Sequence, residues 1–400
     1  MSYSCRFCQS TLDKCVIDLG HQPPSNSYLT EEQLELPEKT FPLKVFVCTS
    51  CWLMQLPAHK TSEELFTSDY AYFSSTSESW CQHAKIFVDK AISRLGLGSS
   101  SNVIELASND GYLLQFMKER GIPCLGVEPT HKTATVARKK GIKTVEKFFN
   151  TKLAKELPPA DLVIANNVLA HVPDIKDFLK GIADVLKPNG QASIEFPHLL
   201  KLLLGNQFDT IYHEHYSYLS LKIVEKISYS VGLEIIDVEE ITTHGGSLRV
   251  WISHIGLKKR SKNVEKILNI EMIAGLEGLD AYTGFQRRAE KTKINLIEYL
   301  IKIRKEGKQI LGYGAAAKGC TLLNYAGIKS DLLPAVADAA GSKQGKYLPG
   351  SHIPIITPEQ FYEQKCDHVL VLPWNLISEF KIKFKGKKII TAIPEIKEWI

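Results

Sequence analysis

The chain has 400 residues, 44% of them hydrophobic, which is enough for two or three domains with several buried cores. Its net charge of +5 is small for this length and its lysines are scattered, so the composition does not indicate nucleic acid binding. No signal peptide or membrane-spanning stretch is visible, and nine cysteines that include two CxxC pairs are typical of metal binding in a reducing compartment. We therefore expect a cytoplasmic monomer with neither a membrane nor a nucleic acid partner.

Two CxxC pairs lie near the N-terminus. Each can present two thiolates to the same side of a tetrahedral zinc ion, and together they supply Cys5, Cys8, Cys48 and Cys51. Four protein ligands would leave the zinc no open position for chemistry, so we expect a structural site. The alternative is that the cysteines are small core residues. We predict a zinc-binding domain over residues 1–65, with Cys15 and His21 outside the site.

A stretch dense in hydroxyl and aromatic side chains precedes a helix predicted at about residues 78–95. It has neither helical nor strand periodicity, as in loops that fold over a ligand. We predict that its substrate-binding residues are Tyr70, Tyr72 and Ser74. The alternative interpretation is an ordinary surface loop that leads into the helix.

A buried strand, a turn of small residues and the start of an amphipathic helix are predicted over residues 103–116. Small residues let a ligand approach the backbone at the carboxyl end of a parallel strand. The predicted cofactor residues of this turn are Glu105, Ala107, Asn109, Asp110 and Gly111. A second strand ends at Glu128 and Pro129 about twenty residues later, where an acid commonly binds ribose hydroxyls. The alternative is a βαβ unit whose acids only face solvent.

The charge of this turn indicates which cofactor it binds. The GxGxxG spacing of pyrophosphate-binding turns is missing, and an acidic turn would repel a pyrophosphate but suit a cation. S-adenosylmethionine carries a sulfonium, so methyl transfer is the predicted chemistry. A third strand runs into Asn166 and Asn167, in a loop that we expect to cover the cofactor, with Leu169 near the adenine and His171 near the methyl group.

A dense group of titratable side chains lies at residues 212–218, where two histidines, one glutamate and three tyrosines fall within seven residues. We favour acid–base chemistry for this segment, because histidine titrates near neutrality. Metal binding by His213 and His215 is the alternative, although no further ligand cluster is close in sequence. Downstream, a glycine turn opens a strand that carries His244 and Arg249, and a cation here suits an anionic or polyhydroxyl substrate.

Helical periodicity predicts a linker over residues 261–306. The last domain, residues 307–400, begins with a strand, a glycine turn and a helix start, and further strands follow, which indicates a second α/β unit. Its turn is basic, so we predict that Lys318 and the helix N-terminus contact the phosphates of a substrate, and that Tyr313 also binds the substrate. A purely structural turn is the alternative.

The motifs in this order resemble those of S-adenosylmethionine-dependent sugar C-methyltransferases, which act on nucleotide-linked 4-keto-6-deoxy sugars. The resemblance covers essentially the whole chain and rests on the CxxC pairs followed by IELASNDGYLL, GVEPT, ANNVLAHVPD, YHEHYSYLS, HGGSLRV and GYGAAAKG. It implies an α/β fold: a zinc-binding domain, a class I (Rossmann-like) methyltransferase domain at residues 66–260 and a Rossmann-like domain that binds the nucleotide-sugar. It also implies that Glu128 binds the ribose and that the active-site residues are His171, Tyr212, Glu214 and His215.

Methylation at carbon sets the chemical requirements of such a site. A C4 ketone acidifies the proton on C3, so the enzyme needs a base near C3 and hydrogen-bond donors near the ketone oxygen. We predict His215 as the base, with Glu214 or Tyr212 orienting it or relaying the proton. His171 is predicted to donate to the enolate. The substrate would be a dTDP- or GDP-linked keto-sugar.

Three other functions are compatible with parts of the sequence. An O- or N-methyltransferase acting on a sugar or another small metabolite is the nearest alternative, because it needs only deprotonation of a heteroatom. A zinc-ribbon RNA-modification enzyme would need a concentrated basic or aromatic face, which the scattered lysines of the ribbon do not provide. A nicotinamide dehydrogenase would use the C-terminal glycine turn, but Asp338 is its only candidate ribose ligand and no catalytic cluster follows.

Overall fold

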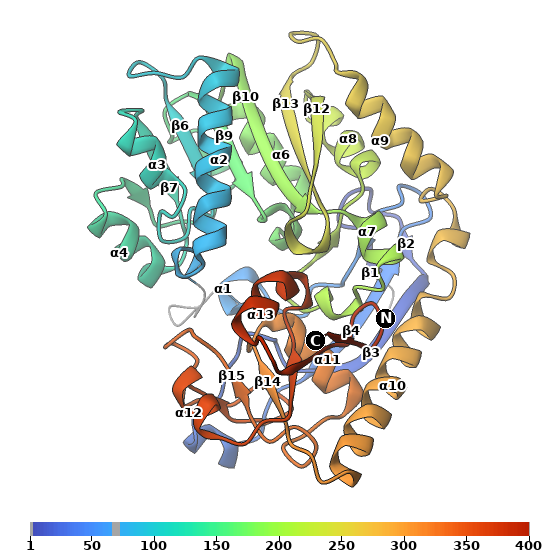
Figure 1. Ribbon diagram of the computed structural model, residues 1–400. Coiled ribbons are helices and arrows are strands. Elements are labelled where there is room, and N and C mark those ends of the chain that lie inside the picture. The colour runs from blue at the N-terminus through green and yellow to red at the C-terminus, as the bar shows by residue number, and fades with distance from the viewer. Residues whose placement is uncertain (1–2, 66–72, 400) are drawn as a thin grey trace.

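The computed structural model describes residues 3–65 and 73–399, which form three regions around a shared centre (Figure 1). Tyr70 and Tyr72, both predicted to contact the substrate, lie outside the described residues. The described strands form a two-stranded sheet and larger sheets of four, seven and six strands. In this part of the chain no helix is long and apolar enough to cross a membrane.

The N-terminal region is an antiparallel β structure. A two-stranded sheet and a four-stranded sheet of order β11-β5-β4-β3 make it up. The strands are β1 (Tyr3–Ser4), β2 (Thr11–Leu12), β3 (Lys14–Gln22), β4 (Phe41–Val47), β5 (Met54–Gln55) and β11 (Ser217–Tyr218). β11 directly follows the predicted acid–base residues and pairs with β5. The predicted domain boundaries did not include this pairing, which brings the segment of residues 212–218 into the sheet of the zinc-binding region.

The central region is a seven-stranded sheet of order β12-β13-β10-β9-β6-β7-β8. All its neighbours are parallel except β13, which runs antiparallel to β10 and β12. The strand order reverses between β6 and β9, and ligands bind beside such a reversal, at the carboxyl ends of the strands. The strands are β6 (Val103–Leu106), β7 (Cys124–Val127), β8 (Thr144–Val145), β9 (Ala160–Asn166), β10 (Leu186–Pro197), β12 (Leu233–Ile241) and β13 (Ser247–His254).

Helices cover both faces of this sheet (Figure 1). Alternate side chains along β6 and β9 enter two separate cores: Val103 and Leu162 pack with α2 and α3, whereas Ile104 and Val163 pack with α6 and α8. Both faces must be apolar, which explains why all four residues of β6 are buried. The helices are α2 (Glu78–Leu95), α3 (Leu114–Glu119), α4 (His131–Lys139), α5 (Thr151–Ala154), α6 (Ile175–Val185), α7 (Leu199–Leu204) and α8 (Leu221–Tyr229).

Two helices, α9 (Lys262–Ile273) and α10 (Phe285–Lys305), lead into the C-terminal region. This region is a six-stranded sheet of order β16-β15-β14-β17-β18-β19, parallel except for β19. Its strands are β14 (Ile310–Tyr313), β15 (Val336–Ala337), β16 (Ile355–Ile356), β17 (His368–Val371), β18 (Lys388–Thr391) and β19 (Lys397–Trp399). Its helices are α11 (Ala317–Ala326), α12 (Pro358–Glu363) and α13 (Ile377–Lys383).

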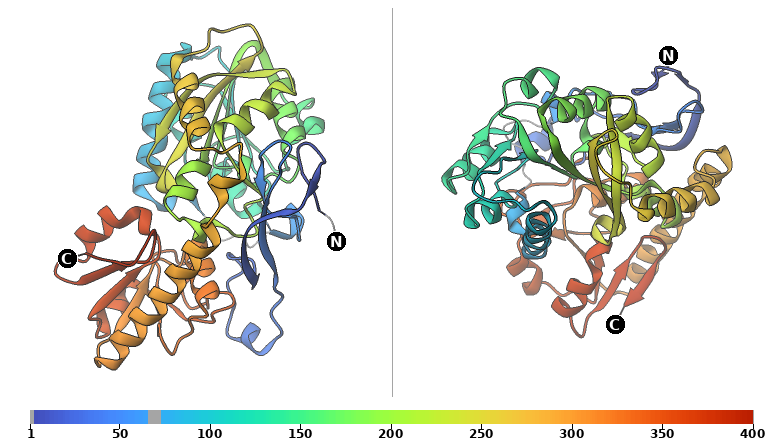
Figure 2. Two further views of the ribbon diagram at one scale, coloured as in Figure 1. Left: turned by 90° about the vertical axis from the view of Figure 1, so that its right-hand side faces the viewer. Right: turned by 90° about the horizontal axis from the view of Figure 1, so that it is seen from above.

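Short helical turns mark several connections. They are η1 (Glu32–Glu35), α1 (Ser62–Leu65), η2 (Ser74–Thr76), η3 (Leu169–His171), η4 (Phe208–Thr210), η5 (Thr243–Gly245), η6 (Leu279–Tyr282) and η7 (Trp374–Leu376). The hydrophobic cores cross the regional boundaries. One core joins β4, α7, α10 and α11, and another joins three of the CxxC cysteines to the central sheet. Figure 2 shows α10, in orange, beside the N-terminal strands, in blue. The three regions therefore pack as one body.

Candidate active site

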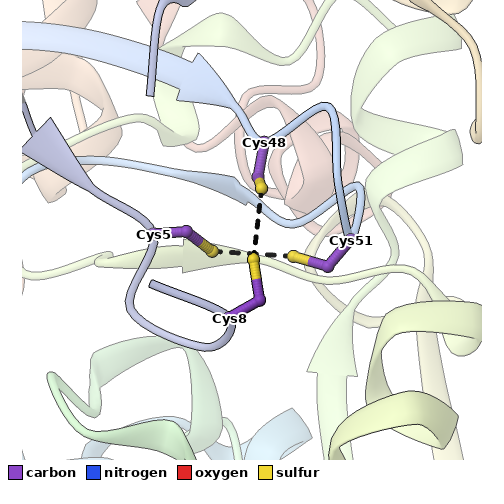
Figure 3. A group of neighbouring side chains, drawn as sticks. All are labelled: Cys5, Cys8, Cys48 and Cys51. Carbon is purple, nitrogen blue, oxygen red and sulfur yellow. Dashed lines mark hydrogen bonds between the residues drawn. The ribbon is translucent and has the colours of Figure 1, made fainter. Parts of the chain in front are cut away.

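The four predicted zinc ligands converge in the structure (Figure 3). All the sulfur atoms of the group lie within 4.8 Å of one another: Cys5, Cys8, Cys48 and Cys51. Each pair closes a tight turn, because the residue after it, Gln9 or Trp52, has a positive φ angle, 64° or 69°, and donates its N–H to the first cysteine of the pair. Four convergent sulfur donors suit a closed, structural zinc site. Cys15 and His21 are not part of the group.

The turn after β6 has the backbone geometry of a ligand-binding loop. Ala107, Asn109 and Gly111 have positive φ angles of 53°, 50° and 74°, a conformation that costs energy for residues other than glycine. A Cβ atom on Gly111 would lie 2.4 Å from Ile142 Cδ1, so this position requires glycine. Glu128 holds the turn, because its Oε2 accepts the backbone N–H of Asn109 at 2.9 Å.

Three carboxyl groups gather at this turn. Glu105, Asp110 and Glu128 are each at most 4% exposed. Burial, together with the charges of Asp110 and Glu128, raises the pKa of Glu105 well above its ordinary value. Glu105 Oε2 and Asp110 Oδ1 have no hydrogen-bond partner among the residues that the structure describes. A bound cation would satisfy such buried oxygens, so the turn fits S-adenosylmethionine, which carries a sulfonium and an ammonium.

The segment before α2 covers this turn. The N–H of Ser74 donates to Asn109 Oδ1 at 2.9 Å, and the hydroxyl of Ser75 donates to Asp110. Ser74 was predicted as a substrate ligand, and the structure places it against the cofactor turn. Residues 73–77 therefore connect the predicted cofactor turn to the start of α2.

The second group of predicted cofactor residues follows β9. Asn166 ends the strand, and Asn167, with a φ angle of 53°, donates its N–H to the carbonyl of Glu195 at 2.7 Å. Asn166 Oδ1 and both polar side-chain atoms of Asn167 have no partner within the described part of the chain. Leu169 is fully buried and Pro129 is half-buried. Because β6 and β9 are neighbours, this loop and the turn after β6 lie at one edge of the sheet.

A hydrogen-bonded pair, Tyr212 and His215, lies in the predicted acid–base segment. His215 Nδ1 is 2.8 Å from the carbonyl oxygen of Thr210, and Nε2 is 2.9 Å from the hydroxyl of Tyr212. A carbonyl can only accept, so Nδ1 carries the proton and Nε2 of the neutral ring accepts from Tyr212. Burial lowers the pKa of His215 well below its ordinary value, and the neighbouring His171, whose ring centroid is 4.6 Å away, adds to this effect. The buried imidazole is therefore neutral, with a lone pair on Nε2, and it is a weaker base than a solvent-exposed histidine.

His213 and Glu214, which lie between Tyr212 and His215 in the sequence, have different surroundings. Glu214 is buried, and its Oε1 accepts a hydrogen bond from Asn26 Nδ2 at 3.1 Å. Burial raises the pKa of Glu214, and its Oε2 has no partner among the described residues. His213 instead meets the ring of Phe41, with the centroids 5.9 Å apart. In the part of the chain that is described, the cysteine group is the only cluster arranged for a metal, so the metal-binding alternative for His213 and His215 has no support.

Arg249, for which a substrate role was predicted, is already paired within the chain. Its guanidinium is 5% exposed and lies 2.8 Å from Glu195 Oε2 and 3.0 Å from His83 Nε2. Burial opposes the ionisation of Glu195, but the hydrogen bond from His83 and the charge of Arg249 lower its pKa to about 2. Glu195 and His83 were missed in the sequence. An acid near the end of a strand is the signal that identified Glu128, and it was available for Glu195 too.

His244 lies in the turn between β12 and β13. Its φ angle is 55°, and its ring meets Trp80 at a centroid distance of 5.4 Å. The preceding Thr243 donates its hydroxyl to Glu195 Oε1 at 3.0 Å, so Glu195 also holds this turn. Burial and the charge of Lys318 lower the pKa of His244 to about 4. This residue is therefore a neutral donor or acceptor within electrostatic reach of the C-terminal region.

The turn after β14 is filled by the protein itself. A Cβ atom on Gly314 would lie 2.5 Å from Pro373 Cδ, and one on Gly319 would lie 2.8 Å from Leu372 Cδ1. Packing against the loop after β17 therefore requires these glycines. Tyr313 was predicted as a substrate ligand, but it is 3% exposed and its ring packs against three phenylalanines. Its side chain is part of the core because β14 is buried on both faces.

Lys318 contacts the loop after β17. Its Nζ donates to Asn375 Oδ1 at 2.6 Å and lies 4.8 Å from the ring centroid of Trp374. Trp374 in turn donates its Nε1–H to Asp209 Oδ2 at 2.7 Å. Burial raises the pKa of Asp209 to about 6, against the charge of Lys318. Asp209 and Trp374 carry no motif and were not anticipated. They connect Lys318 to η4, which includes the carbonyl that orients His215.

Comparisons with known proteins agree with this organisation. The family model of a zinc binding domain matches residues 5–66, that of a methyltransferase domain matches residues 81–238, and that of a C-methyltransferase C-terminal domain matches residues 242–394. The C-methyltransferase NovU of Streptomyces niveus is 34% identical over 401 residues, which cover 98% of this chain and 95% of that protein.

Two solved methyltransferases are similar to part of the chain. An S-adenosylmethionine-dependent methyltransferase from Clostridium acetobutylicum ATCC 824 matches 44% of this chain and 92% of its own, with 15% identity and a TM-score of 0.37. Magnesium protoporphyrin IX methyltransferase from Synechocystis PCC 6803 matches 44% and 83%, with 15% identity and a TM-score of 0.36. On the family models and the full-length relative, the chain belongs to the S-adenosylmethionine-dependent C-methyltransferases with an N-terminal zinc-binding domain and a C-terminal α/β domain.

Proposed function

We propose that this enzyme methylates C3 of a dTDP- or GDP-linked 4-keto-6-deoxy sugar, through an enolate, in deoxysugar biosynthesis. The observation that carries the proposal is the hydrogen-bonded series from the Thr210 carbonyl through His215 to Tyr212. Carbon beside a ketone becomes a nucleophile only after a base removes its proton, and this series provides a buried, neutral base. Membership in the C-methyltransferase family supports carbon as the atom that is methylated.

His215 Nε2 is the basic atom, since Nδ1 is committed to the carbonyl of Thr210. Tyr212 donates its hydroxyl proton to this atom. We propose a relay: the oxygen of Tyr212 takes the proton from C3 while its own proton moves to Nε2. The bonding pair of the C–H bond then moves into the enolate, and the imidazolium that forms keeps its Nδ1–H on Thr210. In this relay His215 is the final proton acceptor, and Tyr212 carries the proton between C3 and His215.

His171 is the proposed donor to the enolate oxygen, because its ring lies beside that of His215 and burial lowers its pKa to about 4. S-adenosylmethionine, when bound, supplies the electrophilic methyl group that the enolate carbon attacks. The chain's part would be to hold it: Glu105 and Asp110 would face its positive charge, and Glu128 would accept from its ribose. Asn166, Asn167 and Leu169 would form the predicted cover.

The substrate would lie between the cofactor turn and the C-terminal region. Lys318 and His244 are the proposed residues on the nucleotide-sugar side, because both lie within electrostatic reach of His215. Residues 73–77 would border the site on its other side, since the N–H of Ser74 donates to Asn109 in the cofactor turn. Burial of the acid–base residues excludes water, which strengthens the interactions that stabilise the enolate.

A substitution of His215 tests the proposal. His215→Asn should lower turnover by about two to four orders of magnitude, since it removes a general base. The dissociation constant for S-adenosylmethionine, measured by calorimetry, should stay near that of the wild type. His213→Asn is the matched control: its ring lies in the same segment but against Phe41, so turnover should be retained.

The product identifies the methylated atom. We expect nuclear magnetic resonance to place the new methyl group on C3. In heavy water with S-adenosylhomocysteine, the C3 proton should exchange in the wild type and not in His215→Asn, provided that the base exchanges with solvent. A methyl group on oxygen or nitrogen would overturn the proposal in favour of an O- or N-methyltransferase. Normal turnover by His215→Asn would overturn the relay and leave Tyr212 without His215, or His171, as the base.

A further inference from the structure

A turn of the N-terminal region reaches into the acid–base segment. The N–H of Ser27 bonds to the carbonyl of Pro24 at 3.1 Å, which closes a β-turn with Asn26 at its third position. From this turn, Asn26 Nδ2 donates to Glu214 Oε1 at 3.1 Å. Nearby, Tyr28 donates its hydroxyl to the carbonyl of Ala315 at 2.7 Å. A segment of the zinc-binding region therefore lies between Glu214 and the start of α11.

The position of this turn is determined by rigid elements on both sides. Two consecutive prolines, Pro23 and Pro24, restrict the backbone directly after β3. The same sheet holds β11, which begins two residues after His215. β3 and β11 are the two edge strands of the N-terminal sheet. Asn26 follows β3, and the acid–base segment leads into β11. Asn26 and Glu214 are fixed to one scaffold, although they are 188 residues apart.

We propose that Asn26 is a positioning residue of the active site: its amide holds the Glu214 carboxylate in the orientation and the ionised form that the acid–base segment requires. This inference rests on the proposed function only in that Glu214 belongs to the active site. It gives the zinc-binding region a role beyond its own metal site, because the region supplies a direct contact to a residue beside the base. The amide is a donor, and a buried carboxylate with few donors is costly to ionise.

The electrostatics of Glu214 set the direction of the effect. Burial raises its pKa, and hydrogen bonds from the side chain and backbone of Asn26 oppose this rise. Five other titratable residues also interact with Glu214. They are Lys60 before α1, His171 after β9, Tyr216 before β11, Tyr218 in β11 and Cys320 in α11. Among these, Lys60 favours the carboxylate by its charge. Losing the amide should therefore raise the pKa of Glu214 further and make the ionised form available only at higher pH.

Asn26→Ala tests the inference in the full-length, zinc-loaded enzyme. We expect kcat/KM to fall about tenfold at neutral pH, as for a lost hydrogen bond to a charged group, and its acidic limb to move up by about one pH unit. The dissociation constant for S-adenosylmethionine and the zinc content should not change. Gln33→Ala is the control, because Gln33 caps Thr30 in the same N-terminal loop, is exposed and has no contact with Glu214.

Two further variants keep the result interpretable. Asn26→Asp preserves the turn but replaces the donor with a like charge, so it should shift the acidic limb at least as far as Asn26→Ala. In the Glu214→Gln background, Asn26→Ala should shift the acidic limb no further, since the group that it acts on is absent. An unshifted acidic limb in both Asn26 variants, or an equal shift in the Glu214→Gln background, would overturn the inference. Methylation at oxygen or nitrogen with the limb shifted as expected would overturn only the proposed function.

Discussion

The two α/β regions of the molecule begin with the same device and use it differently. In each, a buried strand is followed by a turn and a helix, and the second strand is followed by an acid that accepts a backbone N–H of the first turn. Glu128 accepts from Asn109 at 2.9 Å in the central region, and Asp338 accepts from Ala315 at 2.7 Å in the C-terminal region. Topology and the position of the acid therefore do not distinguish the two turns.

What the protein itself places against each turn distinguishes them. Beside the turn after β6, Glu105 and Asp110 keep carboxylate oxygens for which the described residues provide no partner. Glycine packing is alike in both turns, because a Cβ atom would lie 2.4 Å from Ile142 Cδ1 at Gly111 and 2.5 Å from Pro373 Cδ at Gly314. The first turn therefore differs from the second in leaving buried acids for a ligand to satisfy. Unsatisfied buried polar atoms are a better sign of a binding site than glycine in a turn.

The largest effect is expected on stability, at Glu195, a buried acid whose charge is paired within the chain. Glu195→Gln removes the nearer countercharge of the buried Arg249 and leaves it only Glu239, whose Oε2 lies 3.9 Å from Nη1, so the free energy of unfolding should fall by about 3–5 kcal/mol. Thermal unfolding measures the loss. Glu146→Gln is the control, because its pairs with Arg138 and His131 are solvent-exposed and should be worth at most about 1 kcal/mol. Equal shifts in the two midpoints would mean that Glu195 is not a structural acid.

Removing Glu128 and Asp338, the equivalent acids of the two α/β regions, tests whether only the first turn binds the cofactor. Glu128→Ala should weaken the binding of S-adenosylmethionine by about 1.5–3 kcal/mol, because a charged acceptor for the ribose is lost. Asp338→Ala should leave this affinity unchanged, since its carboxylate bonds only within the C-terminal region. Calorimetry on both variants decides. If Glu128→Ala binds as the wild type does, the cofactor lies elsewhere, and a loss in Asp338→Ala would show that the second turn takes part.

The smallest expected effect concerns the cover of the first turn. Ser75→Ala removes a hydroxyl donor to Asp110, so it should weaken cofactor binding by about 0.5–1.5 kcal/mol through a less ordered turn. Ser79→Ala is the matched control, because Ser79 is exposed on α2 and bonds only to Ser77. The dissociation constants should rank Ser75→Ala above both the control and the wild type. A change of the same size in the control would assign the effect to α2 and not to the turn.

Features encoded by neighbouring residues were predictable. The four zinc ligands follow from two CxxC pairs, and the strand, turn and helix over residues 103–116 follow from periodicity and small residues. The structure confirms the convergence of the cysteines and both α/β regions. The pairing of Tyr212 with His215 also joins residues three positions apart. Such contacts are set by local geometry, which a short stretch of sequence specifies.

Contacts between distant residues decided the rest. Arg249 was predicted as a cation for the substrate, but Glu195, 54 residues away, neutralises it, and the glycines after β14 are explained by a loop nearly sixty residues later. Asn26 meets Glu214 only because β11 joins the N-terminal sheet. The sequence by itself determined which side chains could do chemistry and where the turns are. Only the tertiary structure decided which charges are satisfied, because burial and countercharge depend on partners that folding brings together from remote parts of the chain.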